Sequence, residues 1–386
     1  MRSLLARIER SQPLLNAFIT VCTETAVRDA TEAEAVIKRG DALGPLHGIP
    51  FSVKDTIATR GVRTTYGSLI FEKNVPSRSA IAVERAQRAG GILIGKTTTP
   101  EFAFLGMTEA PLFGRTANAW DNDRTCGGSS GGAAAAVAAG LGPVAIATDA
   151  GGSARIPAAC NGVVGFKPSL GRVPHDWADD VFGNTQYVSP IGRSVMDTAI
   201  LLDVIGGPHE SDPHTLYRAA ESHARAAAQG GDLNGLRFCW RPLLGNTVVA
   251  ASVRAACEEA VRVISEMGGE VHESDEAFKN QEGLISRINA SARLAQYGHH
   301  LAGNRDRMCP KLVRQLEQVA HLSAQDLWQG MFERTRLFHQ VQGWFDSSDV
   351  IVTPTLARTA LPIDHDFFAP IEIDAVSYTH LTLPTN

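Results

Sequence analysis

The first half of the chain alternates between helical and extended patterns of hydrophobic residues. Apolar residues spaced three and four apart predict helices over 25–39 and 79–89. Short uninterrupted apolar runs predict strands over 49–53 and 92–94. A run of glycine and alanine over 131–140 predicts a small-residue helix, which can pack closely on a sheet.

Two further strands are predicted over 144–148 and 163–166. This alternation predicts the α/β fold class, a layered structure in which helices flank a central mixed β-sheet. From about residue 210 to 345 the segments become longer, more charged and helical, as in 252–266, 311–318 and 323–341. Because no strong cluster of turn residues precedes this region, we expect a helical elaboration of one domain.

Composition excludes several classes of protein. The chain has 386 residues, of which 44% are hydrophobic and 20% charged, which is enough apolar material for a large core. Its net charge of −5 gives no electrostatic reason to expect nucleic-acid binding. The longest apolar run, 133–147, is interrupted by Gly140, Gly142 and Pro143 and would span a membrane poorly. We therefore expect a cytoplasmic protein without a membrane partner.

The cysteines and histidines give no sign of a metal site. The six cysteines are scattered without a CxxC pair, so they are interpreted as reduced thiols. Cys126 and Cys160 lack a local histidine or glutamate partner and are interpreted as packing residues. The twelve histidines show no HExxH spacing, and His47 is assigned to the turn before the strand at 49–53. Neither a metal nor a cofactor is expected.

Two glycine motifs match known patterns in the wrong context. Residues 90–97 match GxxxxGK[ST], the phosphate-loop pattern, but a helix precedes them and a hydrophobic strand fills the variable positions. Nucleotide binding is therefore a remote alternative, and Lys96 is interpreted as structural. Residues 128–132 match GxSxG, yet a polar loop precedes them where an α/β-hydrolase needs a strand. On its own, this motif is equally typical of a loop that enters a helix.

Three longer motifs change this interpretation. They are GPLHGIPFSVKDT at 44–56, CGGSSGG at 126–132 and TDAGGSARIPAACNGVVGFKPSLGR at 148–172. In order and wording they resemble the amidase signature family, and the separation of 24 positions from Ser129 to Ser153 is the family's usual one. The resemblance is strongest over 14–205. It implies a single amidase domain over 1–374 with its core in that range.

The resemblance implies a catalytic triad of Lys54, Ser129 and Ser153. Ser153 would be the nucleophile that forms an acyl-enzyme, and Lys54 would be the general base. Lys54 ends an apolar strand, where loss of water favours the uncharged amine. In isolation, Lys54 and Asp55 would more often form a solvated ion pair. Ser129, which follows a cis peptide bond in the family, would relay the proton between Ser153 and Lys54.

Further residues are assigned to the oxyanion and to support. The backbone N–H groups of Ala150, Gly151, Gly152 and Ser153 are expected to bind the substrate carbonyl oxygen. The resemblance also matches Asp149, Arg155 and Asn161, which we interpret as residues that fix the loop. Ser130 either supports the relay or caps the helix that begins at residue 131, and both readings stay open.

The C-terminal end departs from the family. After the motif at 352–355, family members continue into a segment that completes the sheet, and this segment is missing here. The last dozen residues, AVSYTHLTLPTN, do not continue the family pattern. We therefore expect the natural sequence to end near Asp374 and residues 375–386 to be a non-native tail.

The leading functional prediction is an amidase that cleaves a small carboxylic amide to the acid and ammonia or an amine. The alternative within the family is the glutaminase A subunit of the glutamyl-tRNA(Gln)/aspartyl-tRNA(Asn) amidotransferase. Residues 182–193, FGNTQYVSPIGR, lack that subunit's ASSLDQ-like wording, which favours the amidase. The substrate pocket is expected around 104–113 and 176–187. The oligomeric state is open, with a homodimer as one alternative.

Overall fold

The computed structural model describes residues 1–183, 185–276, 278 and 282–378. Contacts between Cα atoms divide the chain into two compact units. Unit 1 consists of Met1–Gln229, Asp306–Cys309 and Ala360–Phe367. Unit 2 consists of Gly230–Arg305, Pro310–Thr359 and Phe368–Asn386. The single domain expected over 1–374 stays a prediction.

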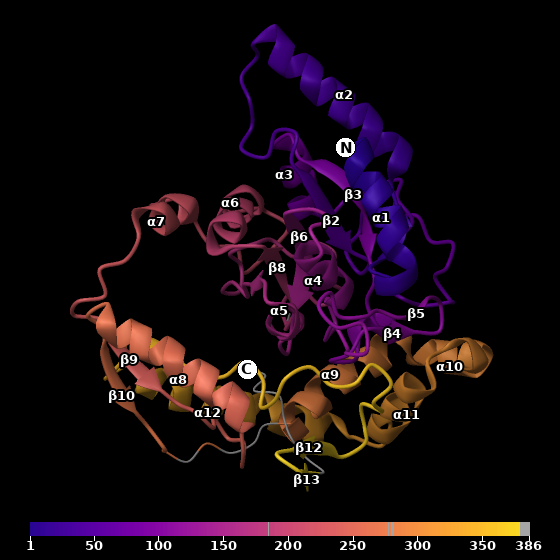
Figure 1. The fold of residues 1–386 in the computed structure, drawn as a ribbon. Helices are drawn as coiled ribbons and strands as arrows, with labels where there is room; N and C mark the ends of the chain where they lie inside the picture. Colours follow the sequence, from indigo (N-terminus) through magenta and orange to yellow (C-terminus); the bar gives the residue numbers. More distant parts are fainter. Residues whose placement is uncertain (184, 277, 279–281, 379–386) are drawn as a thin grey trace. The chain divides into compact units, whose positions relative to one another are not determined.

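Unit 1 contains a six-stranded mixed sheet in the order β1-β3-β2-β6-β8-β7. Figure 1 shows β3, β2, β6 and β8 in this order. The central strand β2 is parallel to both β3 and β6, and the outer pairs are antiparallel. A separate hairpin pairs β4 with β5. The strands are β1 (Phe18–Val21), β2 (Pro50–Lys54), β3 (Ile92–Thr97), β4 (Glu109–Ala110), β5 (Gly114–Arg115), β6 (Val144–Asp149), β7 (Val164–Gly165) and β8 (Tyr187–Gly192).

The helices of unit 1 include every one that the first half of the sequence predicts. They are α1 (Arg2–Leu15), α2 (Thr23–Arg39), α3 (Ile81–Arg88), η1 (Glu101–Ala103), α4 (Gly131–Ala138), α5 (Arg155–Asn161), α6 (Val195–Ile205) and α7 (His223–Gln229). Together with the mixed sheet, they confirm the predicted α/β fold class.

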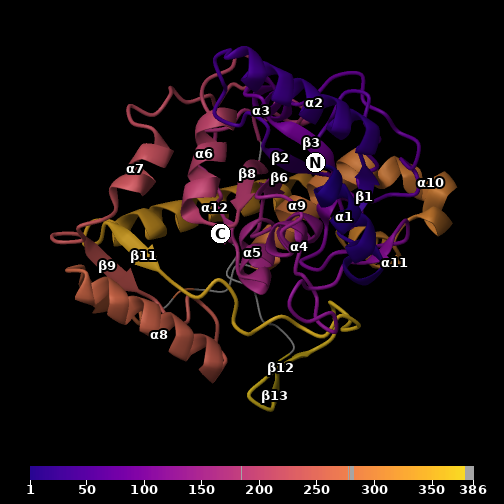
Figure 2. The ribbon, with the colours of Figure 1, turned by 45° about the horizontal axis from the view of Figure 1, so that its top comes forward.

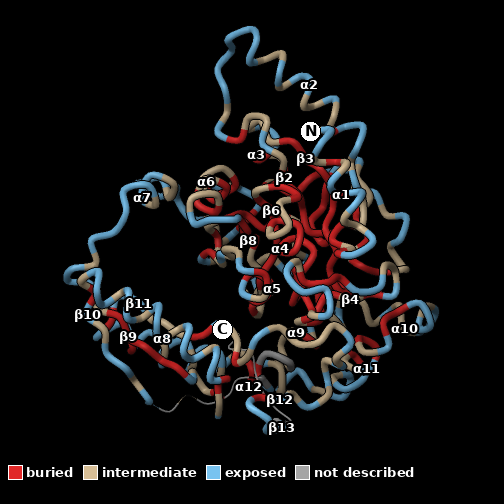
Figure 3. The backbone as a smooth tube through the Cα atoms, in the orientation of Figure 1, coloured by how far each residue is buried: buried red, intermediate tan, exposed pale blue. Residues whose placement is uncertain are grey.

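Helices cover the two faces of the sheet, and side chains alternate between them. Phe51 and Val53 of β2 and Ile146 of β6 share a buried cluster with residues of α3 and α6. Ala145 and Ala147 of β6 pack instead against α4. Buried residues accordingly fill β3 and β6, while α2 and α7 are largely exposed (Figure 3). Because the central strands are covered on both faces, a residue at the end of β2 is buried.

Unit 2 has its own sheet, in which β9 lies between β10 and β11 and all three strands are parallel. Figure 2 labels two of these neighbours, β9 and β11. A second hairpin pairs β12 with β13. The strands are β9 (Arg237–Trp240), β10 (Glu270–Glu273), β11 (Val350–Val352), β12 (Ile371–Ile373) and β13 (Val376–Tyr378). The helices of the later chain are α8 (Ala251–Glu266), α9 (Glu282–Tyr297), η2 (Gly298–His300), α10 (Leu301–Asn304), η3 (Arg305–Arg307), α11 (Pro310–Val319) and α12 (Ala324–Trp344).

The later chain is helical where the sequence predicts it, at α8, α11 and α12. Of the tail expected over 375–386, residues 379–386 lie outside the described residues. None of the helices in the described ranges combines the length and the hydropathy needed to cross a bilayer.

Candidate active site

Lys54 is the last residue of β2 and is completely buried. Its Nζ donates hydrogen bonds to Ser129 Oγ at 2.7 Å and to Thr148 Oγ1 at 3.0 Å. The carboxylate of Asp55 accepts hydrogen bonds from the backbone N–H groups of Thr65 and Gly67. Because Lys54 has no exposed surface, the alternative prediction of a solvated Lys54–Asp55 ion pair is wrong.

Ser129 lies directly before α4, and the peptide bond Gly128–Ser129 is cis, as the resemblance implies. Ser130 occupies the N-cap position of α4, but its hydroxyl makes no capping hydrogen bond. It donates instead to the carbonyl oxygen of Thr148 at 3.1 Å. The structure therefore favours the reading of Ser130 as a support that ties the Ser129 turn to the end of β6.

Ser153 lies in the loop between β6 and α5 and is partly exposed. Its carbonyl oxygen accepts the N–H of Ser130 at 3.0 Å, so the two serine loops are joined through their backbones. Within the described ranges, no hydrogen bond joins Ser129 Oγ to Ser153 Oγ. The structure thus forms the link between Lys54 and Ser129, and the link from Ser129 to Ser153 stays a prediction.

The Ser153 loop is fixed by an ion pair between the buried Asp149 and the partly exposed Arg155. The carboxylate of Asp149, at the end of β6, accepts hydrogen bonds from Nε and Nη2 of Arg155 at 2.9 and 2.8 Å. The same carboxylate accepts the N–H groups of Gly152 and Ala154 at 2.8 and 3.1 Å. Burial alone would raise the pKa of Asp149, but the hydrogen bonds and charge of Arg155 and these N–H groups together lower it. Asp149 therefore stays charged and holds the loop in place.

This arrangement bears on the expected oxyanion donors. The N–H of Gly152 points to Asp149. Gly152 has φ 98°, a conformation that glycine adopts readily, and this lets the chain turn back toward the carboxylate. The N–H groups of Ala150, Gly151 and Ser153 have no backbone or side-chain acceptor among the described residues. The assignment of these three N–H groups to the oxyanion stays a prediction.

The loop before Ser129 is packed closely from two sides. A Cβ atom placed on Gly128 would lie 2.8 Å from backbone atoms of Met107, so only glycine fits there. Asn161 of α5 donates to the carbonyl oxygen of Cys126 at 2.9 Å and accepts the N–H of Ala119 at 3.1 Å. Asn161 therefore fixes the loop before Ser129.

The two cysteines near the serines are held as thiols. Burial raises the pKa of Cys160 to about 12 and raises that of Cys126 even further. Because a thiol must ionise to act as a nucleophile, neither is suited to the chemistry. Both agree with the interpretation as packing residues.

Residues 90–97, which match the phosphate-loop pattern, lie largely in a buried strand and not in a loop before a helix. β3 contains Lys96, which is completely buried, and no helix begins there. Lys96 Nζ donates to the hydroxyl groups of Thr59 and Thr64 at 3.0 and 2.9 Å and to the carbonyl oxygen of Ile57. Lys96 thus fixes the chain that follows β2 through hydrogen bonds. This supports the interpretation of Lys96 as a structural residue.

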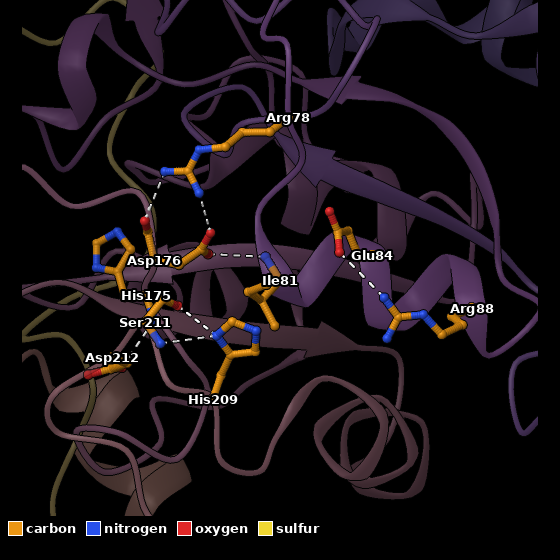
Figure 4. Close-up of polar contacts among 9 residues, drawn as sticks. All are labelled: Arg78, Ile81, Glu84, Arg88, His175, Asp176, His209, Ser211 and Asp212. Carbon is orange, nitrogen blue, oxygen red and sulfur yellow. Dashed lines mark hydrogen bonds and ion pairs between the residues drawn. The ribbon is translucent and has the colours of Figure 1, made fainter.

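One part of the expected substrate pocket has another role. Asp176 accepts the N–H of Ile81 at the start of α3 at 3.0 Å and pairs with Arg78 at 2.8 Å (Figure 4). The start of the segment 176–187 therefore stabilises α3. Tyr187, at its other end, pairs in register with Asp149. Residue 184 lies outside the described residues.

Thr148, the second hydroxyl partner of Lys54, is a site residue that the sequence did not reveal. Its place in the motif, directly before Asp149, was the one signal for it. The oxygen atoms of Thr148 hold both Lys54 and Ser130, which makes this residue the centre of the buried hydroxyl network.

Comparisons with known proteins identify the family of the chain. The family model described as Amidase matches residues 1–386. An acylamidase of Rhodococcus erythropolis is 36% identical over 97% of this chain and 78% of its own length. The A subunit of the glutamyl-tRNA(Gln) amidotransferase of Symbiobacterium thermophilum is 35% identical over 96% of this chain and 81% of its own.

A solved structure of a bacterial aryl acylamidase of the amidase signature family superposes with a TM-score of 0.88 at 30% identity. The match covers 97% of this chain and 80% of that one. The chain belongs to the amidase signature family and is an amide-hydrolysing enzyme.

Proposed function

We propose that the protein is an amidase that works through an acyl-enzyme on Ser153, with Lys54 as the base and Ser129 as the proton relay. The observation that carries this proposal is the buried 2.7 Å hydrogen bond from Lys54 Nζ to Ser129 Oγ. It holds an amine against a serine whose loop is joined by a backbone hydrogen bond to the loop of Ser153. An uncharged amine in this position can accept a proton through one hydroxyl group.

In the first half of the reaction, Oγ of Ser153 bonds to the amide carbon while its proton passes to Ser129 and the proton of Ser129 passes to Lys54. The N–H groups of Ala150, Gly151 and Ser153 stabilise the oxyanion, where loss of one donor typically costs about 3–4 kcal/mol. The proton then returns to the leaving nitrogen, the C–N bond breaks and the amine departs. Water repeats these steps on the ester and releases the acid.

The test is turnover of aliphatic, aryl and indolyl amides by the full chain. Ser153→Ala and Lys54→Ala should abolish turnover and leave the circular dichroism spectrum unchanged. Mass spectrometry of the wild type, quenched during turnover of an activated substrate, should show the acyl group on the peptide that contains Ser153.

Matched controls are Lys38→Ala and Ser265→Ala, since both residues are exposed and lie on α2 and α8. They should keep wild-type turnover. An acyl group on another residue, or full activity of Ser153→Ala, would show the mechanism to be wrong.

A second candidate function is glutamine hydrolysis as the glutaminase component of an amidotransferase. The 35% identity to such a component over most of the chain favours it. The two candidates differ in what the chain does alone. Hydrolysis of simple amides by the isolated protein supports the amidase, whereas release of ammonia from glutamine only with partner subunits and charged tRNA supports the amidotransferase.

We also propose a cytoplasmic location. The six cysteines, all of them in described ranges, are free thiols, which suits a reducing compartment. Fractionation of the native cells, followed by detection of the protein, tests this. Recovery outside the cytoplasmic fraction would contradict it.

A further inference from the structure

A cavity of about 810 Å³ in unit 1 is lined by four arginines. Lys54, Ser129 and Ser153 do not contribute to its wall. Arg85 and Arg88 come from α3, Arg172 from the chain before β8, and Arg218 from the chain before α7. Only two acidic residues, Asp203 and Glu221, share the wall. We call this cavity the arginine pocket.

Arg85 is held in place by neutral partners. Its Nη1 donates to the carbonyl oxygens of Ile205, Gly206 and Gly207 at 3.0, 2.8 and 2.8 Å, and its Nη2 donates to that of Pro208 at 2.7 Å. These carbonyl groups lie at the C-terminal end of α6, which the guanidinium caps. They satisfy the N–H donors and stabilise the guanidinium with partial negative charge, but none of them carries a full negative charge.

Asp203 is committed to another task. Its carboxylate accepts hydrogen bonds from Ser222 Oγ at 2.5 Å, from the N–H of His223 at 2.9 Å and from the N–H of Ala224 at 3.0 Å. His223 Nδ1 adds a contact of 2.6 Å. Asp203 thus fixes the first turn of α7, and its oxygens are occupied by donors other than the four arginines.

The other three guanidinium groups have little acidic compensation. Among the described residues, the one ion pair of Arg88 is a long, exposed contact of 3.4 Å with Glu84 (Figure 4). Arg172 Nη1 donates to the carbonyl oxygen of Tyr217 at 2.8 Å. In the described part of the chain, no carboxylate lies within ion-pair distance of Arg172 or Arg218. The wall therefore carries an excess of positive charge.

The arginines are close enough to repel one another. Burial lowers the pKa of Arg85, and the positive charges of Arg218 and Arg88 lower it further. A negative group placed among them would relieve this repulsion. The geometry and the charge balance thus favour an anion in the same place.

The remaining wall is apolar and includes Pro45, Ala89, Ile200, Leu202 and Val204. The volume is far larger than a single inorganic anion needs and lies in the range of small-molecule sites. Guanidinium groups match the oxygens of a phosphoryl group with paired hydrogen bonds. We propose that the arginine pocket binds a small organic phosphate, with the phosphoryl group at Arg88, Arg172 and Arg218 and the organic part on the apolar wall.

The test is isothermal titration of the full chain with phenyl phosphate at low ionic strength. We expect saturable binding of one molecule per chain and none for phenol, which lacks the charge. Arg218→Gln should weaken binding at least about tenfold. Arg172→Gln is the second variant, for use if Arg218→Gln alters the fold. It should also weaken the binding of phenyl phosphate.

The matched control is Arg225→Gln, which removes the same charge as Arg218→Gln. Arg225 is exposed on α7 and does not line the pocket. It should leave binding unchanged. The proposal is overturned if phenyl phosphate shows no saturation, if phenol binds equally well, or if Arg225→Gln weakens binding as much as Arg218→Gln. Amide turnover plays no part in this readout, so the outcome is independent of the mechanism proposed above.

Discussion

Lys54 and Thr148 are joined by a hydrogen bond of 3.0 Å that lies wholly inside the protein, where the two residues are 0% and 1% exposed. Thr148 belongs to β6 and Lys54 to the neighbouring strand β2. A group on a rigid strand therefore directs the amine toward Ser129. This contact positions Lys54, and it can be tested apart from the nucleophile.

Thr148→Val keeps the shape of the side chain but removes its hydroxyl group. Loss of a buried hydrogen bond costs about 1–2 kcal/mol, so kcat should fall roughly 5- to 30-fold while KM changes little. Thr148→Ser should recover most of the loss, because it restores the oxygen. Steady-state kinetics with one amide measure both. Wild-type kcat for Thr148→Val would contradict this role.

Arg155→Met should destabilise the protein by about 3–5 kcal/mol, because it leaves the carboxylate of Asp149 buried without its partner. Urea unfolding at neutral pH measures the loss. The double variant Asp149→Asn with Arg155→Met is the control and should recover part of it. A single variant as stable as the double one would show that the charge of Asp149 is compensated elsewhere.

The same pair sets a dependence on acid. Since the pKa of Asp149 is lowered in the folded protein, its contribution is present above the unfolded value of about 3.9 and is lost as the pH falls through the folded value. Below about pH 4, the unfolding free energy of the wild type should therefore fall more steeply than that of Arg155→Met. Urea midpoints measured from pH 5 to pH 3 test this.

Lys96 should also make stability rise with pH, but in the alkaline range. Burial lowers its pKa to about 8 in the folded protein, while the unfolded chain keeps the proton up to about pH 10.4. Between these values the unfolded state binds more protons, so stability from this group rises with pH by up to about 1.4 kcal/mol per unit. Compared with Lys96→Met, the wild type should gain stability from pH 8 to 10. The exposed control Lys38→Met should show the same dependence of stability on pH as the wild type. If the stability of Lys96→Met also changes with pH in parallel with the wild type, the lowered pKa of Lys96 is refuted.

Thiol reagents should leave the enzyme active. Iodoacetamide reacts with thiolates, and burial keeps Cys126 and Cys160 protonated. Peptide mapping after treatment at pH 8 should find both unmodified in the native protein and both alkylated in urea. Loss of activity in step with alkylation of Cys126 would contradict its assignment to packing.

Much of unit 1 could be predicted from hydrophobic pattern alone. β2 and β6 are short apolar runs because both faces of each strand are covered, and α4 stands out because its sequence is almost wholly glycine and alanine. The pattern could not bring Lys54 and Ser129 together across 75 residues of sequence. That prediction came from the resemblance of three motifs in order.

The rest depends on contacts that leave no local signal. Asp176 caps α3 from 95 residues away, and Arg85 caps α6 across 120 residues. Ser130 sits where a capping serine is expected, yet its hydroxyl turns to Thr148 because that carbonyl group is near. The hydrogen-bond partner of each of these side chains depends on which backbone groups the folded chain leaves without a partner.

Helix α4, which begins just after the relay residue Ser129, packs on the sheet through small side chains. Ala133 and Ala134 of α4 meet Ala145 and Ala147 of β6, and a Cβ atom on Gly132 would collide with the backbone of Thr98. The height of α4 above the strands therefore also sets how deep Ser129 reaches. A bulkier residue at Ala134 would push α4 away from the strands and move Ser129 Oγ away from Lys54 Nζ. The reaction rate would then depend on a side chain that does not contact the substrate.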